Sequence, residues 1–165
     1  MRRSLLLLGI AAAALSLVAT AGAVPPTTEA LHFEDAFDID CGTFVLHEEF
    51  ATDVRVTTYF DNAGNPDHLI VHEQFRGFIE TPDGTFIADP GNINTFVDLA
   101  GTPDDESDDT ARQTGMIFAI TVPGHGIVAH DTGLIIFEPD GDVIIRGPHE
   151  VFEQGLEPLL CPVFA

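Results

Sequence analysis

Glu73 is the side chain whose position most suggests chemistry, because it interrupts an otherwise apolar pattern. On the strand predicted for residues 68–81, the other residues of its face are apolar or glycine, namely Leu69, Val71, Phe75, Gly77 and Ile79. Burial would raise the pKa of the Glu73 carboxyl unless Arg55 or another donor paired with it, and a raised pKa suits a general acid or base. A salt-bridged structural carboxylate, or a break in the strand register, would produce the same pattern without chemistry.

His125 is the second candidate, because it lies between two glycines in the segment Pro123-Gly124-His125-Gly126. Glycine permits positive φ, so an unusual backbone is predicted there. An imidazole so placed could bind a ligand or carry a proton, although a plain hairpin turn also explains the motif. Phe75 and Phe118, on predicted strand faces, complete the candidate ligand-binding set. Because the sequence has no nucleophile elbow, zinc-protease motif or phosphate-binding glycine loop, we predict no catalytic residue, metal ligand or cofactor.

Residues 104–109 form an acidic run with five carboxylates in six positions. Such a run attracts a hard cation, so weak Ca²⁺ binding is one reading. The run lacks the glycine-turned ligand spacing of an EF-hand loop, and dense like charges usually mark a solvated loop. Both readings stay open from the sequence.

Residues 1–23 have the order of a secretory signal peptide. Arg2 and Arg3 precede an apolar run over residues 5–18, and Ala21-Gly22-Ala23 supplies the small residues of a cleavage site. The apolar run is shorter than the roughly 20 residues of a membrane-spanning helix, so a retained anchor is the lesser alternative. The arginine pair also leaves the twin-arginine export route open. We expect a secreted, extracellular chain of 142 residues after cleavage.

The chain is strongly acidic, with 27 Asp and Glu residues against 6 Arg and no Lys. Removing the signal leaves four arginines and a formal charge of −23. Such a surface repels phosphate backbones and anionic lipids, so neither nucleic acid nor, after signal cleavage, a membrane is an expected partner. It favours cations and basic proteins, or simply keeps the protein soluble.

Cys41 and Cys161 are the only cysteines. In an exported protein an even pair predicts one disulfide, here one that would close nearly the whole domain. A metal site from two such distant cysteines, or a pair of free thiols, is the alternative.

The remaining chain is predicted to form one all-β domain over residues 31–165, after an extended leader over residues 24–30. About eight strands separated by turn signals are predicted, at residues 43–50, 53–60, 68–81, 85–88, 94–99, 114–122, 127–138 and 142–146. No helical pattern lies between them, so we predict an antiparallel meander closed into a barrel, with a two-sheet β-sandwich as the alternative. Apolar residues at helical spacing after residue 148 predict a short C-terminal helical or turn segment.

Five segments carry a resemblance to known proteins: FDNAGNP at 60–66, IVH at 70–72, FRG at 75–77, ITVPGHG at 120–126 and GPHE at 147–150. They resemble small secreted bacterial β-barrel proteins that have no assigned function. The resemblance spans most of the chain after the signal and implies the barrel fold, without bringing catalytic residues. In size and topology the chain is also similar to the barrel shared by allene oxide cyclases and dirigent proteins. The absence of Trp weakens a lipocalin reading.

These observations favour a non-catalytic binding or scaffold module for a small apolar ligand, if the barrel lumen is open rather than filled by its own side chains. A cyclase or isomerase with a luminal Glu or His is one alternative. An acidic cell-surface or matrix interaction protein is the other. An apolar patch on the outside of the barrel would indicate a homodimer.

Overall fold

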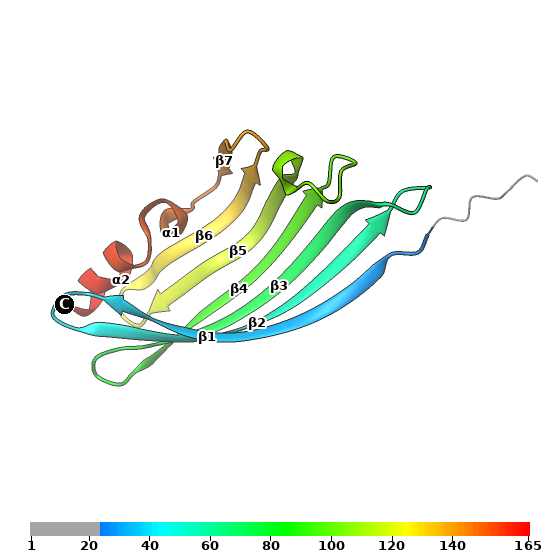
Figure 1. Cartoon of the computed structure of the whole chain (residues 1–165). Coiled ribbons are helices and arrows are strands. Elements are labelled where there is room, and N and C mark those ends of the chain that lie inside the picture. Colours follow the sequence, from blue (N-terminus) through cyan, green and yellow to red (C-terminus); the bar gives the residue numbers. More distant parts are fainter. Residues whose placement is uncertain (1–23) are drawn as a thin grey trace, which may run out of the picture.

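The computed structural model describes residues 24–165, and the predicted signal peptide lies outside them. The described chain is one curved sheet followed by two short helices (Figure 1). The strands are β1 (Thr27–Asp40), β2 (Val45–Phe60), β3 (Pro66–Glu80), β4 (Phe86–Asp98), β5 (Thr110–Val122), β6 (Gly126–Phe137) and β7 (Val143–Arg146). A 3-10 turn, η1 (Glu106–Asp108), follows β4, and the helices α1 (Glu150–Gln154) and α2 (Glu157–Phe164) end the chain.

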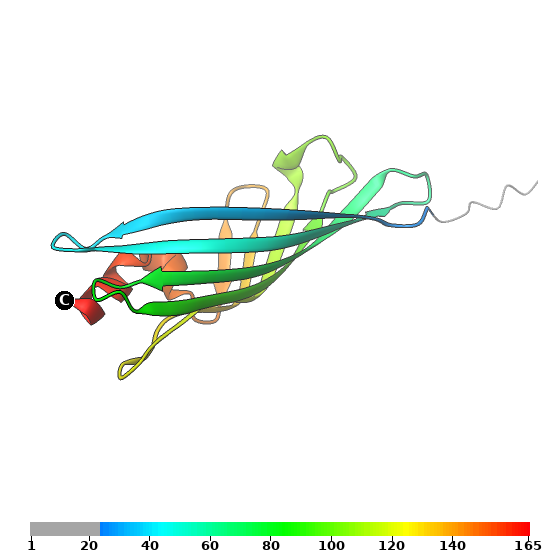
Figure 2. The same cartoon turned by 90° about the horizontal axis from the view of Figure 1, so that it is seen from below.

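The seven strands pair in sequence order, each antiparallel to the next, which confirms the predicted all-β meander. The predicted closure of about eight strands into a barrel is not formed by the described residues, because β1 and β7 are the two edges of the sheet. The predicted C-terminal helical segment is confirmed, and both helices pack against β6. Figure 2 shows β5 to β7, in yellow-green to orange, running at an angle to the longer strands β1 to β4.

Two predicted strand breaks are absent, and one strand was missed. Residues 43–60 and 85–99 each hold one strand, β2 and β4, where two were predicted. β4 accommodates Pro90 because pairing with β5 begins only at Asn92, so the strand has a partner on one side alone at the proline. β1 includes the end of the predicted leader and is exposed except at Ile39. Its many acids give it the composition of a loop, yet edge strands commonly carry such charges.

Gly115 and Gly133 allow the sheet to curl between β4 and β7. They are register partners on β5 and β6, and both have strongly positive φ, 130° and 132°. A Cβ atom at either position would lie 2.2 Å from a carbonyl oxygen of the neighbouring strand, which no side chain tolerates. Glycine is therefore required at both positions for the strands to approach this closely.

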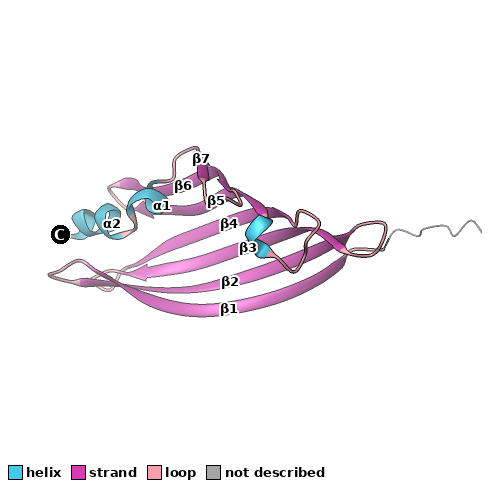
Figure 3. Ribbon diagram, turned by 45° about the horizontal axis from the view of Figure 1, so that its top comes forward, coloured by secondary structure: helices cyan, strands magenta, loops and turns pink. Residues whose placement is uncertain are grey.

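The hydrophobic core lies on the concave face, at the end of the sheet where α2 packs. It contains the buried side chains Ile39, Leu46, Ile79, Ile87, Ile120, Val122, Ala129 and Leu160. The predicted Cys41–Cys161 disulfide is present, with the two Cα atoms 5.4 Å apart, and it ties the β1–β2 turn to α2. Because α2 also contacts β6, the helix spans from one margin of the sheet toward the other at this end (Figure 3).

Candidate functional site

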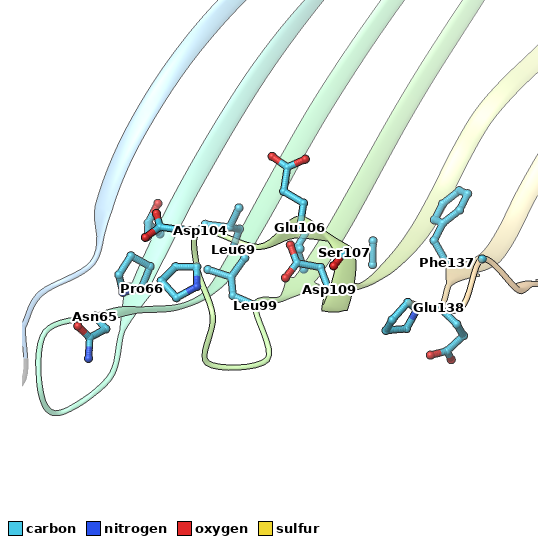
Figure 4. A pocket seen from close by; sticks show the side chains of 16 residues that line it. Asn65, Pro66, Leu69, Leu99, Asp104, Glu106, Ser107, Asp109, Phe137 and Glu138 are labelled. Atoms are coloured by element: carbon cyan, nitrogen blue, oxygen red, sulfur yellow. The ribbon is translucent and has the colours of Figure 1, made fainter.

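A pocket of about 970 Å³ occupies the other end of the concave face, opposite the end where α2 packs. Figure 4 shows its lining: Asn65 lies in the β2–β3 turn, Pro66 and Leu69 are on β3, Leu99 follows β4, and Phe137 lies on the opposite side. The β4–β5 loop forms one side, and the β6–β7 turn forms the other. The pocket is therefore built from elements that are distant in sequence and adjacent only in the fold.

The floor of the pocket is one continuous row across the sheet. Its members are successive register partners from β2 to β6, namely Thr58, Leu69, Val97, Ala111 and Phe137. Strand alternation places all of them on the concave face, so their apolar surfaces adjoin. We call these five residues the floor row. The ring of Phe137 packs edge-on against that of Phe152 of α1, with centroids 6.5 Å apart, and Phe137 is still 36% exposed.

The rim of the pocket is acidic. Its charged side chains are Asp104, Glu106 and Asp109 from the β4–β5 loop and Glu138 from the β6–β7 turn, and no Lys or Arg lines it. Figure 4 shows Glu106 and Asp109 on the loop side and Glu138 on the opposite side. Burial, followed by the charges of Asp108 and Glu106, raises the pKa of Asp109. The four carboxylates thus give the rim a strongly negative potential.

An aromatic row crosses the concave face between this pocket and the core. Phe37, Phe50, Phe75 and Phe118, from β1, β2, β3 and β5, have successive ring centroids 6.1, 5.1 and 6.2 Å apart. Tilted and edge-on pairs at these separations are favourable aromatic contacts. All but Phe37 are half-buried, so the aromatic row extends the apolar surface of the concave face toward its middle.

Two buried carboxyls, Glu48 and Asp89, lie next to the core. Both side chains are fully buried, and within the described residues no hydrogen bond of good geometry reaches either carboxylate, although the backbone amide of Ala119 favours the charged form of Asp89. Burial raises the pKa of Asp89 to about 8, helped by the charge of Glu48 and by a hydrogen bond to it. Burial also raises the pKa of Glu48. Two acceptors form a hydrogen bond only when one carries a proton, so the pair holds one proton near neutral pH, with Asp89 donating to Glu48.

Asp131 and His149 are the other buried ionisable residues of the concave face. Asp131 accepts hydrogen bonds from the amides of Val151 (2.7 Å) and Phe152 (2.9 Å) and so satisfies the start of α1. His149 pairs with Asp131 across the backbone, and neither of its ring nitrogens has a partner among the described residues. Asp131 therefore has a structural role, because it fixes the helix that covers the core.

The structure brings two of the four predicted ligand-binding residues together. Phe75 and Phe118 meet in the aromatic row. Glu73 lies on the same concave face, half-buried between Val54 and Ile93, as its strand pattern predicts. Within residues 24–165 it forms no ion pair, so the alternative of a salt bridge to Arg55 is not realised. His125 is separate: it lines a pocket of about 400 Å³ that also includes Phe164 of α2.

Sequence reasoning missed the two carboxyls that are most deeply buried. Glu48 stands between Leu46 and Phe50 in a period-two pattern, and Asp89 stands in the same way between Ile87 and Gly91. The signal that singled out Glu73 was therefore present twice more. For Asp89 the signal was hidden because the predicted strand ended at residue 88. For Glu48 the signal lay inside the predicted strand 43–50 and was overlooked.

No group of three or more His, Cys, Asp or Glu side chains converges as a metal site within residues 24–165. Calcium binding at residues 104–109 stays a prediction. Among the described helices, none has the length and apolar character needed to cross a bilayer. Comparison with protein families, with curated proteins and with solved structures finds no match. The resemblance to small secreted barrel proteins and to dirigent-type barrels also stays a prediction.

Proposed function

We propose that this protein is a secreted, non-catalytic module that binds a small apolar ligand in the 970 Å³ pocket. One observation carries the proposal: the floor row places four adjoining apolar side chains, from Leu69 to Phe137, in a pocket whose volume matches that of small-molecule sites, roughly 300–1,000 Å³. In this proposal the ligand binds on the concave face of the open sheet, and not inside a closed barrel as the sequence predicted. The helices and the disulfide close one end, and the ligand occupies the other.

Binding of a neutral fluorescent probe, N-phenyl-1-naphthylamine, tests the proposal. Ala111 lies in the floor row, so Ala111→Phe should fill the pocket and weaken probe binding by about tenfold or more, equivalent to about 1.4 kcal/mol. Ala88→Phe is the matched control, because Ala88 is exposed on the opposite face of β4. Equal probe affinity in the wild type and in Ala111→Phe would contradict the proposed pocket.

A second variant leaves the pocket open, so its result does not depend on whether the blocked variant Ala111→Phe folds correctly. The chain has no Trp, so Phe137→Trp introduces a single emitter at the pocket. Bound probe should quench this Trp by energy transfer. Phe86→Trp is the control at the far end of β4, where Phe86 is 64% exposed. Similar quenching in the two variants would place the probe elsewhere.

Acid–base catalysis is a second candidate, because Glu48 and Asp89 share a proton in a dry environment. A catalytic pair must be reached by reagents, whereas a structural pair is sealed. Labelling with a water-soluble carbodiimide, mapped by peptide mass spectrometry on the native protein, separates the two. The binding proposal expects exposed acids such as Glu29 to react and the pair to stay unlabelled; selective labelling of Glu48 or Asp89 would favour catalysis.

A further inference from the structure

The pocket combines an apolar floor with a rim of one charge sign. The floor row supplies Leu69, Val97 and Phe137, and the rim supplies the four carboxylates Asp104, Glu106, Asp109 and Glu138. A ligand that is apolar throughout would leave these charges facing its surface without a counter-charge. The rim therefore constrains the ligand beyond the requirement that it be apolar.

No arginine of the described chain compensates the rim. Arg112 is the nearest in sequence, but it is exposed, and alternation along β5 directs it away from the face that carries Ala111. Arg76 pairs with Asp53, on the outer face of β2 and β3. Arg55 and Arg146 do not line the pocket either. The positive charge that would balance the rim has to come from outside the described chain.

One carboxylate oxygen at the rim also lacks a donor. Asp109 lines the pocket, and its Oδ1 atom accepts no hydrogen bond within the described residues. By contrast, Asp105 accepts hydrogen bonds from the backbone amide and hydroxyl of Ser107. The hydrogen bonds of the loop thus leave one acceptor of Asp109 unpaired beside the pocket. A cationic group that donates hydrogen bonds would supply both a counter-charge and a donor.

We propose that the ligand of this pocket is an amphipathic cation, with an apolar body on the floor row and an ammonium group at the acidic rim. This inference rests on the proposed function, since it specifies the ligand of the same pocket. Protonated amines and quaternary ammonium groups share the required charge. Only the amine can also donate a hydrogen bond to Asp109, so any advantage of an amine over a quaternary ammonium group would report that bond.

Displacement of N-phenyl-1-naphthylamine by ten-carbon compounds tests the inference. The competitors are decylamine, decyltrimethylammonium, 1-decanol and decanoate, each below its micelle concentration at pH 7 and low salt. We expect both cations to displace the probe at concentrations about tenfold below that of decanol, and decanoate to be weakest. Added salt should weaken displacement by the cations alone, because it screens exposed charges.

Variants identify which carboxylates cause the preference for cations. Glu106→Gln combined with Asp109→Asn should bring the cations close to decanol, without changing displacement by decanol. Glu29→Gln combined with Glu153→Gln is the control, because it removes the same number of exposed charges outside the pocket. The cation preference should persist in this control.

The outcomes separate this inference from the proposed function. If decanol and the two cations displace the probe equally, or if decanoate is strongest, the inference is overturned while the pocket proposal stands. The inference is likewise overturned if the control variant abolishes the cation preference, since a general acidic surface would then be its source. If the probe does not bind and none of the four compounds perturbs the Trp of Phe137→Trp, the proposed function itself fails.

Discussion

Glu48 of β2 and Asp89 of β4 meet across the intervening strand β3, over Gly77. Asp89 is the register partner of Gly77, and a Cβ at Gly77 would lie 2.9 Å from the Oε1 atom of Glu48. The missing side chain of Gly77 is what gives the two carboxyls room to share a proton. Glu48 and Asp89 thus form a contact that depends on a bound proton. This contact joins β2 and β4, whose backbones are not paired with each other.

The stability of the fold should depend on the proton held by this pair. The pKa of Asp89 is raised from 3.8 to about 8 in the folded protein, so the folded state holds a proton that the unfolded chain releases. Its contribution is fully present below about pH 4, declines as the pH rises toward 8, and is absent above that. The full loss is on the order of a few kcal/mol.

Asp89→Asn tests this, because the amide is neutral at every pH and still donates a hydrogen bond to Glu48. Measured by urea unfolding, the free energy of unfolding of the variant minus that of the wild type should increase between pH 5 and pH 9. Glu29→Gln, at an exposed position, should show no such trend. A flat difference for Asp89→Asn would mean that both carboxyls are ionised in the folded state.

Gly77 and Gly91 should differ in their tolerance of a methyl group. The Cβ of Gly77→Ala would meet the side chains of Glu48 and Phe75, which can shift, so we expect a loss of about 1–3 kcal/mol. The Cβ of Gly91→Ala would lie 2.6 Å from the backbone oxygen of Ile117, so a larger loss is expected. Urea unfolding gives both values, and the reverse order would show that the packing over Gly77 is the more rigid.

The disulfide should stabilise the fold chiefly by restricting the unfolded chain. It closes a separation of 120 residues, and removing such a constraint costs about 4–5 kcal/mol in the chain-entropy model. Replacing both cysteines by serine should therefore lower the unfolding free energy and expose Leu160 as α2 detaches. Hydrogen exchange of the α2 amides reports the detachment. Unchanged protection of α2 would indicate that its apolar contacts suffice.

The concave face shows which parts of the fold could be predicted from the sequence. The alternation in residues 68–81 correctly predicted the face shared by Glu73, Phe75 and Ile79, because a long strand carries enough repeats to fix its phase. Asp89 was missed because Pro90-Gly91 suggested a strand end before it, and Glu48 was missed because the predicted strand 43–50 is short and ends two residues after it. Pairing with neighbouring strands overrides those local preferences, and such pairing is not encoded in any short segment.

The pocket itself could not be predicted, for a similar reason. Its floor row joins residues from five strands through register, and its rim depends on where the acidic loop folds back. Barrel closure failed as a prediction because strand count and spacing do not determine whether the edges meet. Here β7 has only four residues, whereas β1 has 14, so the two edges are poorly matched for pairing.

The central claim is that the pocket binds an amphipathic ligand. Its most direct test is a set of intermolecular NOEs from decyltrimethylammonium to the side chains of the isotope-labelled protein. We predict NOEs from the alkyl chain to the methyls of Leu69, Val97 and Ala111, and NOEs from the ammonium methyls to the side-chain CH2 protons of Glu106. NOEs confined to the outer face, for example to Ile70 or Ile144, would contradict the account.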